Sequence, residues 1–120
     1  MSLYKPFTTQ YGRCAVKAYE LMQGGVDPEV AWDKAAYEII PTKSSRIKSC
    51  PKYFFLGLFG IKRGRGVNTE YAIKALNILK NRDINLDEVS AEEFWNNELS
   101  DKTYNEQVHI LFDLKAKGYL

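Results

Sequence analysis

CPKYFFLGLF, residues 50–59, is the segment of this chain that says most about its fold. A proline next to the first residue is typical of the first turn of a helix. The residues that follow are apolar on every side of that helix, and such a helix must be buried by its neighbours. Periodicity alone would also allow a strand, and Pro51 favours the helix. We therefore predict a short buried helix that begins with Cys50 as its N-cap.

The segments before this helix also carry helical signals. Apolar residues recur at helical spacing from Tyr11 to Met22, and Gly24-Gly25 is typical of a helix end. Asp27-Pro28 then predicts an N-cap followed by proline at the first helical position. Pro41 is expected to stop that second helix.

The segments after it continue the same pattern. Gly60 to Gly66 is predicted to be a loop, and the later apolar stripes again have the helical period. The predicted helix starts are Asn68 or Thr69, the capping box of Ser90 with Glu93, and the capping box of Thr103 with Glu106. No run alternates strictly enough for a strand. We expect an all-α fold, with residues 1–120 forming a single compact domain of five to six short helices.

Composition supports that class and excludes others. The chain has 120 residues, 45% of them hydrophobic and 13% aromatic, with a net charge of +2, so it is not a disordered chain. Its longest apolar stretch, Tyr53 to Ile61, has nine residues, against the roughly 20 needed to span a membrane. The N-terminus shows no basic segment followed by an apolar one, which predicts a cytoplasmic protein and no membrane partner.

The cysteines and the histidine do not match a metal motif. Cys14 and Cys50 lie 36 positions apart, and His109 is the sole histidine. This spacing fits no standard zinc site, so we expect no metal, no cofactor and reduced thiols.

The charges are distributed very unevenly. No acidic residue occurs between Glu38 and Glu70, whereas residues 83–120 hold nine acidic and three basic residues. The basic residues of this window are Lys43, Arg46, Lys48, Lys52, Lys62, Arg63 and Arg65. Basic residues interleaved with glycines and tyrosines suit phosphate contact and base stacking. They predict a non-enzymatic module that binds a polyanion, with nucleic acid as the first candidate.

Two other interpretations of the charges stay open. The basic and acidic surfaces could pair within the fold or across a homodimer, or the basic segment could simply be a solvated loop. The sequence pI of about 8.5 is below the value above 9 that is usual for nucleic-acid-binding domains.

Cys50 supports a second hypothesis, an enzyme or a thiol redox sensor. A helix N-terminus and nearby lysines favour the thiolate, and His109 would be its imidazole partner. The alternative is a structural cysteine that packs as a small hydrophobic residue, which we also expect for Cys14. The sequence therefore leaves enzyme activity open and favours its absence.

The predicted last helix and the aromatic residues offer further candidates. Asn105, His109 and Asp113 share a helical face, where Asp113 could orient His109 as a general base. The alternative is that this face is solvated. Trp32 and Trp95 lie on apolar faces and are predicted to be core.

The whole pattern resembles a family of small uncharacterised bacterial proteins. The segments that carry the resemblance are Cys50-Pro51-Lys52, Phe55-Leu56-Gly57-Leu58, Tyr11-Gly12, Ala31-Trp32, Asn68 through Tyr71-Ala72, Ala75-Leu76, Asn105-x-Gln107-Val108 and Leu114-x-x-x-Gly118-Tyr119-Leu120. The chain departs from the family pattern after Leu58, where Phe59-Gly60-Ile61-Lys62 stands in place of Cys-Glu-Glu-Gly. Because the family has no known function, the resemblance implies no catalytic residue.

Overall fold

The computed structural model describes residues 4–61, 66–100 and 102–120, and helices are the regular structure of this part of the chain. Six helices lie where the sequence predicts them. They are α1 (Gln10–Gln23), α2 (Pro28–Ile39), α4 (Ser49–Leu58), α5 (Val67–Asn81), α6 (Ala91–Phe94), which continues as the π-helical turn η1 (Trp95–Leu99), and α7 (Gln107–Ala116). A single turn, α3 (Lys43–Arg46), is additional. The all-α class is confirmed, and no strand occurs in the described ranges.

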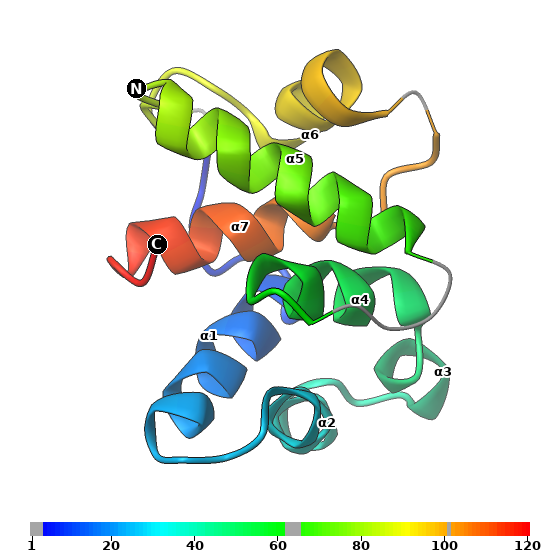
Figure 1. Cartoon of the computed structure of the whole chain (residues 1–120). Helices are drawn as coiled ribbons and strands as arrows, with labels where there is room; N and C mark the ends of the chain where they lie inside the picture. Colours follow the sequence, from blue (N-terminus) through cyan, green and yellow to red (C-terminus); the bar gives the residue numbers. More distant parts are fainter. Residues whose placement is uncertain (1–3, 62–65, 101) are drawn as a thin grey trace.

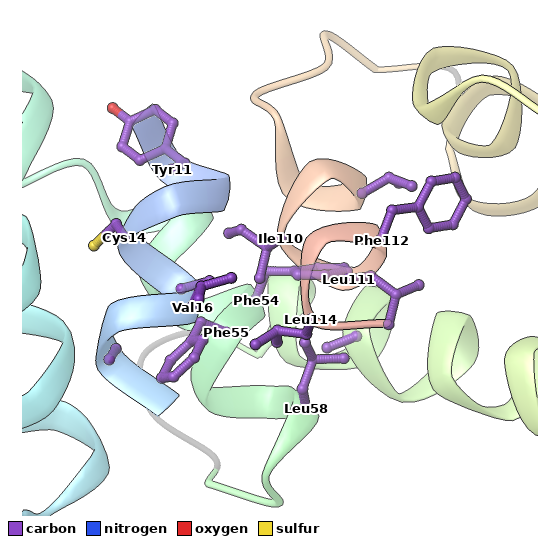
Figure 2. Packing of buried hydrophobic residues seen from close by; sticks show 14 of the residues in the cluster. Tyr11, Cys14, Val16, Phe54, Phe55, Leu58, Ile110, Leu111, Phe112 and Leu114 are labelled. Carbon is purple, nitrogen blue, oxygen red and sulfur yellow. The ribbon is translucent and has the colours of Figure 1, made fainter. Parts of the chain in front are cut away.

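The helices pack around α7. Helices α1 and α2 form one pair and α4 and α5 another, while α7 contacts α1, α4 and α6 and crosses the middle of the molecule (Figure 1). Side chains of α1, α4 and α7 meet in one apolar cluster that includes Val16, Phe54 and Leu111 (Figure 2). The radius of gyration of 13.3 Å is close to the value of about 14 Å expected for a compact chain of this length.

Helix α4 is buried as its composition predicts. Phe54, Phe55 and Leu56 have no exposed surface, and Leu58 is also buried. Gly57 allows α4 to approach α5 closely, because a Cβ at this position would lie 2.9 Å from the Cα of Thr69. The central position of residues 50–59 thus depends on one small residue as well as on apolar ones.

Three of the predicted helix boundaries are confirmed. Helix α1 ends at Gln23 with Gly24 as its C-cap, as the glycine pair predicts. Asp27 accepts hydrogen bonds from the backbone N–H groups of Glu29 and Val30 at 3.1 and 3.3 Å. Ser90 accepts one from the N–H of Glu93 at 3.1 Å. In the last two cases the capping side chain satisfies donors that the helix itself leaves free.

Three other predicted starts are wrong. Helix α4 begins at Ser49 after Lys48, so Cys50 is the second helical residue and not the N-cap. Helix α5 begins at Val67, after Gly66 with a φ of 82°, and no side chain caps it. Helix α7 begins at Gln107, after Glu106 with a φ of 66°, so Thr103 does not cap it.

The prediction of a solvated face on the last helix is also wrong. Asn105 lies outside α7, and its N–H donates to Oε1 of Gln107 at 2.8 Å. Asp113 is fully buried and His109 is half-buried, because α1, α4 and α6 cover α7 from several sides. Trp32 and Trp95 are each 1% exposed, which confirms that both are core.

In the part of the chain that the structure describes, no helix is both long and apolar enough to cross a bilayer.

Candidate functional site

The structure places four of the seven basic residues of the acid-free window. Lys62, Arg63 and Arg65 lie outside the described residues. Lys43 and Lys48 are exposed, whereas Arg46 and Lys52 are partly buried. The four residues therefore differ in their surroundings. The two partly buried ones contact residues of α2 or of the segment that follows it.

Arg46 holds α3 against the end of α2. Its Nε donates to the carbonyl of Ile40 at 2.5 Å, and its guanidinium also donates to the carbonyl of Pro41 at 3.3 Å. The guanidinium lies 4.9 Å from the ring centroid of Tyr37, within the range of a cation–π contact. Arg46 therefore satisfies backbone acceptors after α2 while its guanidinium lies over the Tyr37 ring.

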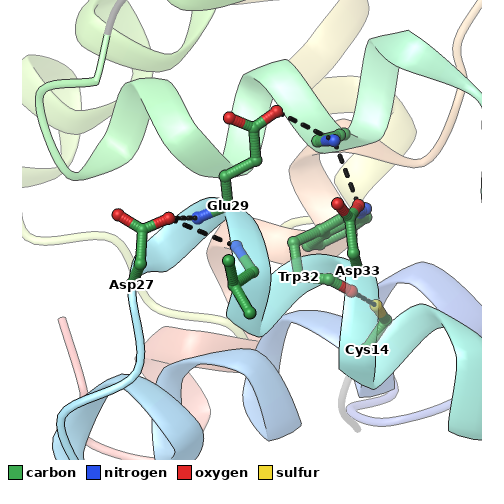
Figure 3. A network of polar contacts seen from close by, with 7 residues as sticks. Cys14, Asp27, Glu29, Trp32 and Asp33 are labelled. Carbon is green, nitrogen blue, oxygen red and sulfur yellow. Dashed lines mark hydrogen bonds and ion pairs between the residues drawn. The ribbon is translucent and has the colours of Figure 1, made fainter.

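Lys52 is held by two acidic residues of α2. Its Nζ lies 3.1 Å from Glu29 and 3.0 Å from Asp33, and Figure 3 shows both carboxylates reaching from α2 toward α4. Burial lowers the pKa of Lys52, but the hydrogen bonds and charges of Asp33 and Glu29 outweigh burial and raise this pKa overall. Lys52 therefore stays protonated, and its positive charge is already compensated by its neighbours.

A groove runs between α2 and the segment from α3 to α4. It is lined by Asp33, Ala36, Tyr37, Arg46, Ile47, Ser49, Lys52 and Tyr53, and we call it the basic–aromatic groove. Tyr37 is 74% exposed and Ile47 is 70% exposed, the two highest values among the large hydrophobic residues that the structure describes. Exposed large apolar side chains beside charged ones are a common mark of an interaction surface.

The two cysteines occupy different surroundings. Cys14 is fully buried, its thiol lies 3.9 Å from the carbonyl of Trp32, and burial raises its pKa, so it is a core residue (Figure 3). Cys50 is a free, half-buried cysteine in the first turn of α4. Among the described residues, no hydrogen bond joins its thiol to the His109 ring.

His109 is bound instead by Tyr104. The backbone N–H of His109 donates to the Tyr104 hydroxyl at 2.9 Å, and that hydroxyl lies 2.6 Å from Nδ1 of the imidazole. Burial raises the pKa of Tyr104, so the phenol keeps its proton. When the hydroxyl donates its proton to Nδ1, the ring proton of a neutral imidazole is on Nε2.

Burial also keeps the imidazole neutral. It lowers the pKa of His109, and the carboxylate of Glu92 opposes that effect without reversing it. In that tautomer His109 presents Nε2 as an N–H donor near neutral pH, in place of the unprotonated nitrogen of a general base.

Asp113 is part of a buried cluster that includes the N-terminal segment. Its Oδ1 accepts hydrogen bonds from the hydroxyl of Tyr4 and, at 3.0 Å, from the N–H of Phe7. Burial raises the pKa of Asp113, and both hydrogen bonds counteract the increase. Its Oδ2 packs so close to Gly12 of α1 that a Cβ on this glycine would lie 1.9 Å away. Asp113 thus fixes the N-terminal segment and does not bond to His109.

Tyr4 and Tyr104 were not predicted to belong to any site. The sequence does contain one indirect signal, because an isolated glycine inside a helical pattern, here Gly12, often has a packing reason. Nothing in the local pattern identifies either tyrosine as the partner of a polar residue in α7.

A polar cleft lies above His109. It has a volume of about 360 Å³ and is lined by Tyr4, Lys5, Thr8, Ser90, Ala91, Glu92 and His109. We call it the histidine cleft. It shares no residue with the basic–aromatic groove. The described residues contain no group of three His, Cys, Asp or Glu side chains placed to hold a metal ion.

Comparison with known proteins gives a family but no function. The model of a family described as "Family of unknown function (DUF6979)" matches residues 8–120, nearly the whole chain. No curated protein and no solved structure matches the chain.

Proposed function

The chain belongs to this family of unknown function, and we propose that it is a non-enzymatic module that binds single-stranded nucleic acid in the basic–aromatic groove. The observation that carries the proposal is the exposed Tyr37 ring paired with the Arg46 guanidinium at 4.9 Å. Bases stack on aromatic rings and on guanidinium planes, and each stacked base contributes about 1–3 kcal/mol. Unpaired bases are required for this, which favours single strands over duplexes.

Phosphate contacts come from the exposed lysines of the segment from α3 to α4, which forms one side of the groove. Lys43 and Lys48 are exposed, and neither forms an ion pair within the described part of the chain. Both can therefore release counterions when they meet a phosphate, the main source of affinity for nucleic acids. Lys52 contributes less, because Glu29 and Asp33 already neutralise its charge.

The experiment measures binding and its dependence on salt. Labelled single-stranded RNA, single-stranded DNA and duplex DNA are titrated with the protein at about 50 and 200 mM salt, and fluorescence anisotropy reports binding. We expect both single strands to bind more tightly than the duplex. The variant Lys43→Ala/Lys48→Ala removes two phosphate contacts, so the slope of log affinity against log salt should fall in magnitude by about 1.4.

A matched variant controls for net charge. Lys74→Ala/Lys80→Ala removes the same charge from exposed positions of α5, and we expect its affinity and salt slope to stay close to those of the original chain. An equal loss of affinity in both double variants would show a nonspecific charge effect and would contradict binding in the groove. Absence of binding at 50 mM salt would reject the proposal.

Stacking is tested separately at Tyr37. Tyr37→Ala should lower the affinity about 5- to 100-fold without changing the salt slope, and Tyr37→Phe should retain most of it. Sedimentation at both salt concentrations accompanies these titrations. A dimer that dissociates at high salt, combined with no binding of nucleic acid, would favour pairing of the basic and acidic surfaces between two copies.

A further inference from the structure

The histidine cleft has one rigid hydrogen-bond donor. The His109 ring is fixed by the hydroxyl of Tyr104 at 2.6 Å, and the rings of Tyr4 and Tyr104 lie 5.5 and 5.6 Å from it, centroid to centroid. Tyr4 is itself fixed, because its hydroxyl donates to the buried Asp113. The ring is therefore held in one orientation, with Nδ1 against the Tyr104 hydroxyl, and Nε2 forms no hydrogen bond among the described residues.

The charges of the cleft come from two residues of opposite sign. Lys5 and Glu92 both line the cleft, both are exposed, and neither forms an ion pair among the described residues. Together with a neutral imidazole they give the cleft no net charge. A phosphate dianion would be opposed by the carboxylate of Glu92, whereas a ligand that carries one charge of each sign satisfies both residues.

We propose that the histidine cleft binds a small zwitterion, a free α-amino acid. The carboxylate accepts from Nε2–H of His109 and from the ammonium of Lys5, and the ammonium group donates to Glu92. The cleft volume of about 360 Å³ falls within the range of small-molecule sites. This site is independent of the basic–aromatic groove, so either proposal can fail without the other.

The sole histidine of the chain makes the test direct. The imidazole ¹⁵N signals of the labelled protein report the tautomer and any ligand at the ring. Without ligand, we expect Nε2 to have the shift of a protonated nitrogen and Nδ1 that of an unprotonated one at pH 7.5. The opposite tautomer would overturn the proposal, because Nε2 could not donate to a carboxylate.

The second step is a titration with a panel of α-amino acids from small to large side chains. At least one should move the Nε2 signal with saturation. Propionate, ethylamine and inorganic phosphate each carry only one sign of charge, and we expect them to bind at least about tenfold more weakly. Equal binding of propionate or phosphate, or no saturable shift with any amino acid up to 10 mM (about −2.7 kcal/mol of binding free energy), would overturn the proposal.

Two neighbouring glutamates provide a matched pair of variants. Glu92→Gln removes the partner of the ligand ammonium and should weaken binding about tenfold or more. Glu93→Gln makes the same chemical change one residue away, at an exposed position that does not line the cleft, and should leave affinity unchanged. Equal affinities of the two variants would show that Glu92 does not bind the ligand and would contradict the proposed site.

Discussion

The basic–aromatic groove and the buried cluster around Asp113 handle polar groups in opposite ways. One side of the groove belongs to the densest positive segment of the sequence, yet Lys52 is compensated by two carboxylates and Arg46 is bonded to two backbone carbonyls. The cluster contains few ionisable groups, and α1 and α7 enclose them almost completely. The number of basic residues in a run of sequence therefore overstates the positive electrostatic potential at the folded surface, because neighbouring groups compensate part of the charge.

The same contrast sets the energies involved. An ion pair at the surface contributes about 0–1 kcal/mol, because water already solvates and screens both partners. A buried polar group that loses its hydrogen bond costs about 1–3 kcal/mol, because water cannot replace the lost partner. The stability of this chain should therefore depend more on the Asp113 cluster than on the charged groove.

The largest expected effect tests how tightly the cluster is packed. In Gly12→Ala the new Cβ would lie 1.9 Å from Oδ2 of Asp113, a side chain already fixed by two hydrogen bonds. We expect a loss of about 3 kcal/mol in the free energy of unfolding, measured by urea denaturation. Gly24→Ala is the control on the same helix, because its Cβ would meet only a carbonyl oxygen at 3.4 Å. Similar stabilities of the two variants would show that Asp113 moves freely. The cluster would then be no more tightly packed than the basic–aromatic groove.

A smaller effect compares one type of hydrogen bond in two environments. Tyr4 donates to the buried Asp113, and Tyr119 donates to the exposed Glu20 at 2.8 Å. Tyr4→Phe leaves the buried carboxylate with one donor fewer, so it should cost about 2 kcal/mol. Tyr119→Phe should leave the free energy of unfolding unchanged within error, since water replaces the hydroxyl. Thermal unfolding of both variants measures the difference, and equal melting temperatures would contradict it.

The smallest effect concerns Lys52. Its side chain is 17% exposed and those of Glu29 and Asp33 are 33% and 58% exposed, so screening by solvent reduces the value of both ion pairs. Lys52→Ala should cost less than about 1 kcal/mol of stability. A double-mutant cycle with Asp33→Ala isolates the pair, and a coupling energy well above 1 kcal/mol would show that the groove is stabilised as strongly as the cluster.

The sequence predicts best those features that depend on near neighbours. The caps at Asp27 and Ser90 are correct because each side chain bonds to a backbone N–H two or three residues away. The predicted start of α7 is wrong because Glu106 adopts a left-handed backbone conformation. The composition of the sequence does not indicate this conformation for a glutamate. The single turn α3 is too short to show a period.

The candidate sites depend on contacts that are distant in sequence, so they were predicted less well. The sequence predicts Asp113 either as a partner of His109 or as a solvated residue, whereas Asp113 is bonded to Tyr4, 109 residues earlier in the chain. His109 was identified as a candidate, but its hydroxyl partner was not. The basic residues were identified as well, whereas the carboxylates that compensate Lys52 come from another helix.

The contact between Gly12 and Asp113 couples two positions that lie a hundred residues apart. A shorter side chain at position 113 leaves room for a larger residue at position 12, so Asp113→Ser should rescue part of the stability that Gly12→Ala loses. In a library of variants, these two positions should therefore be randomised together. Changing one position at a time would miss pairs of residues that are stable only in combination.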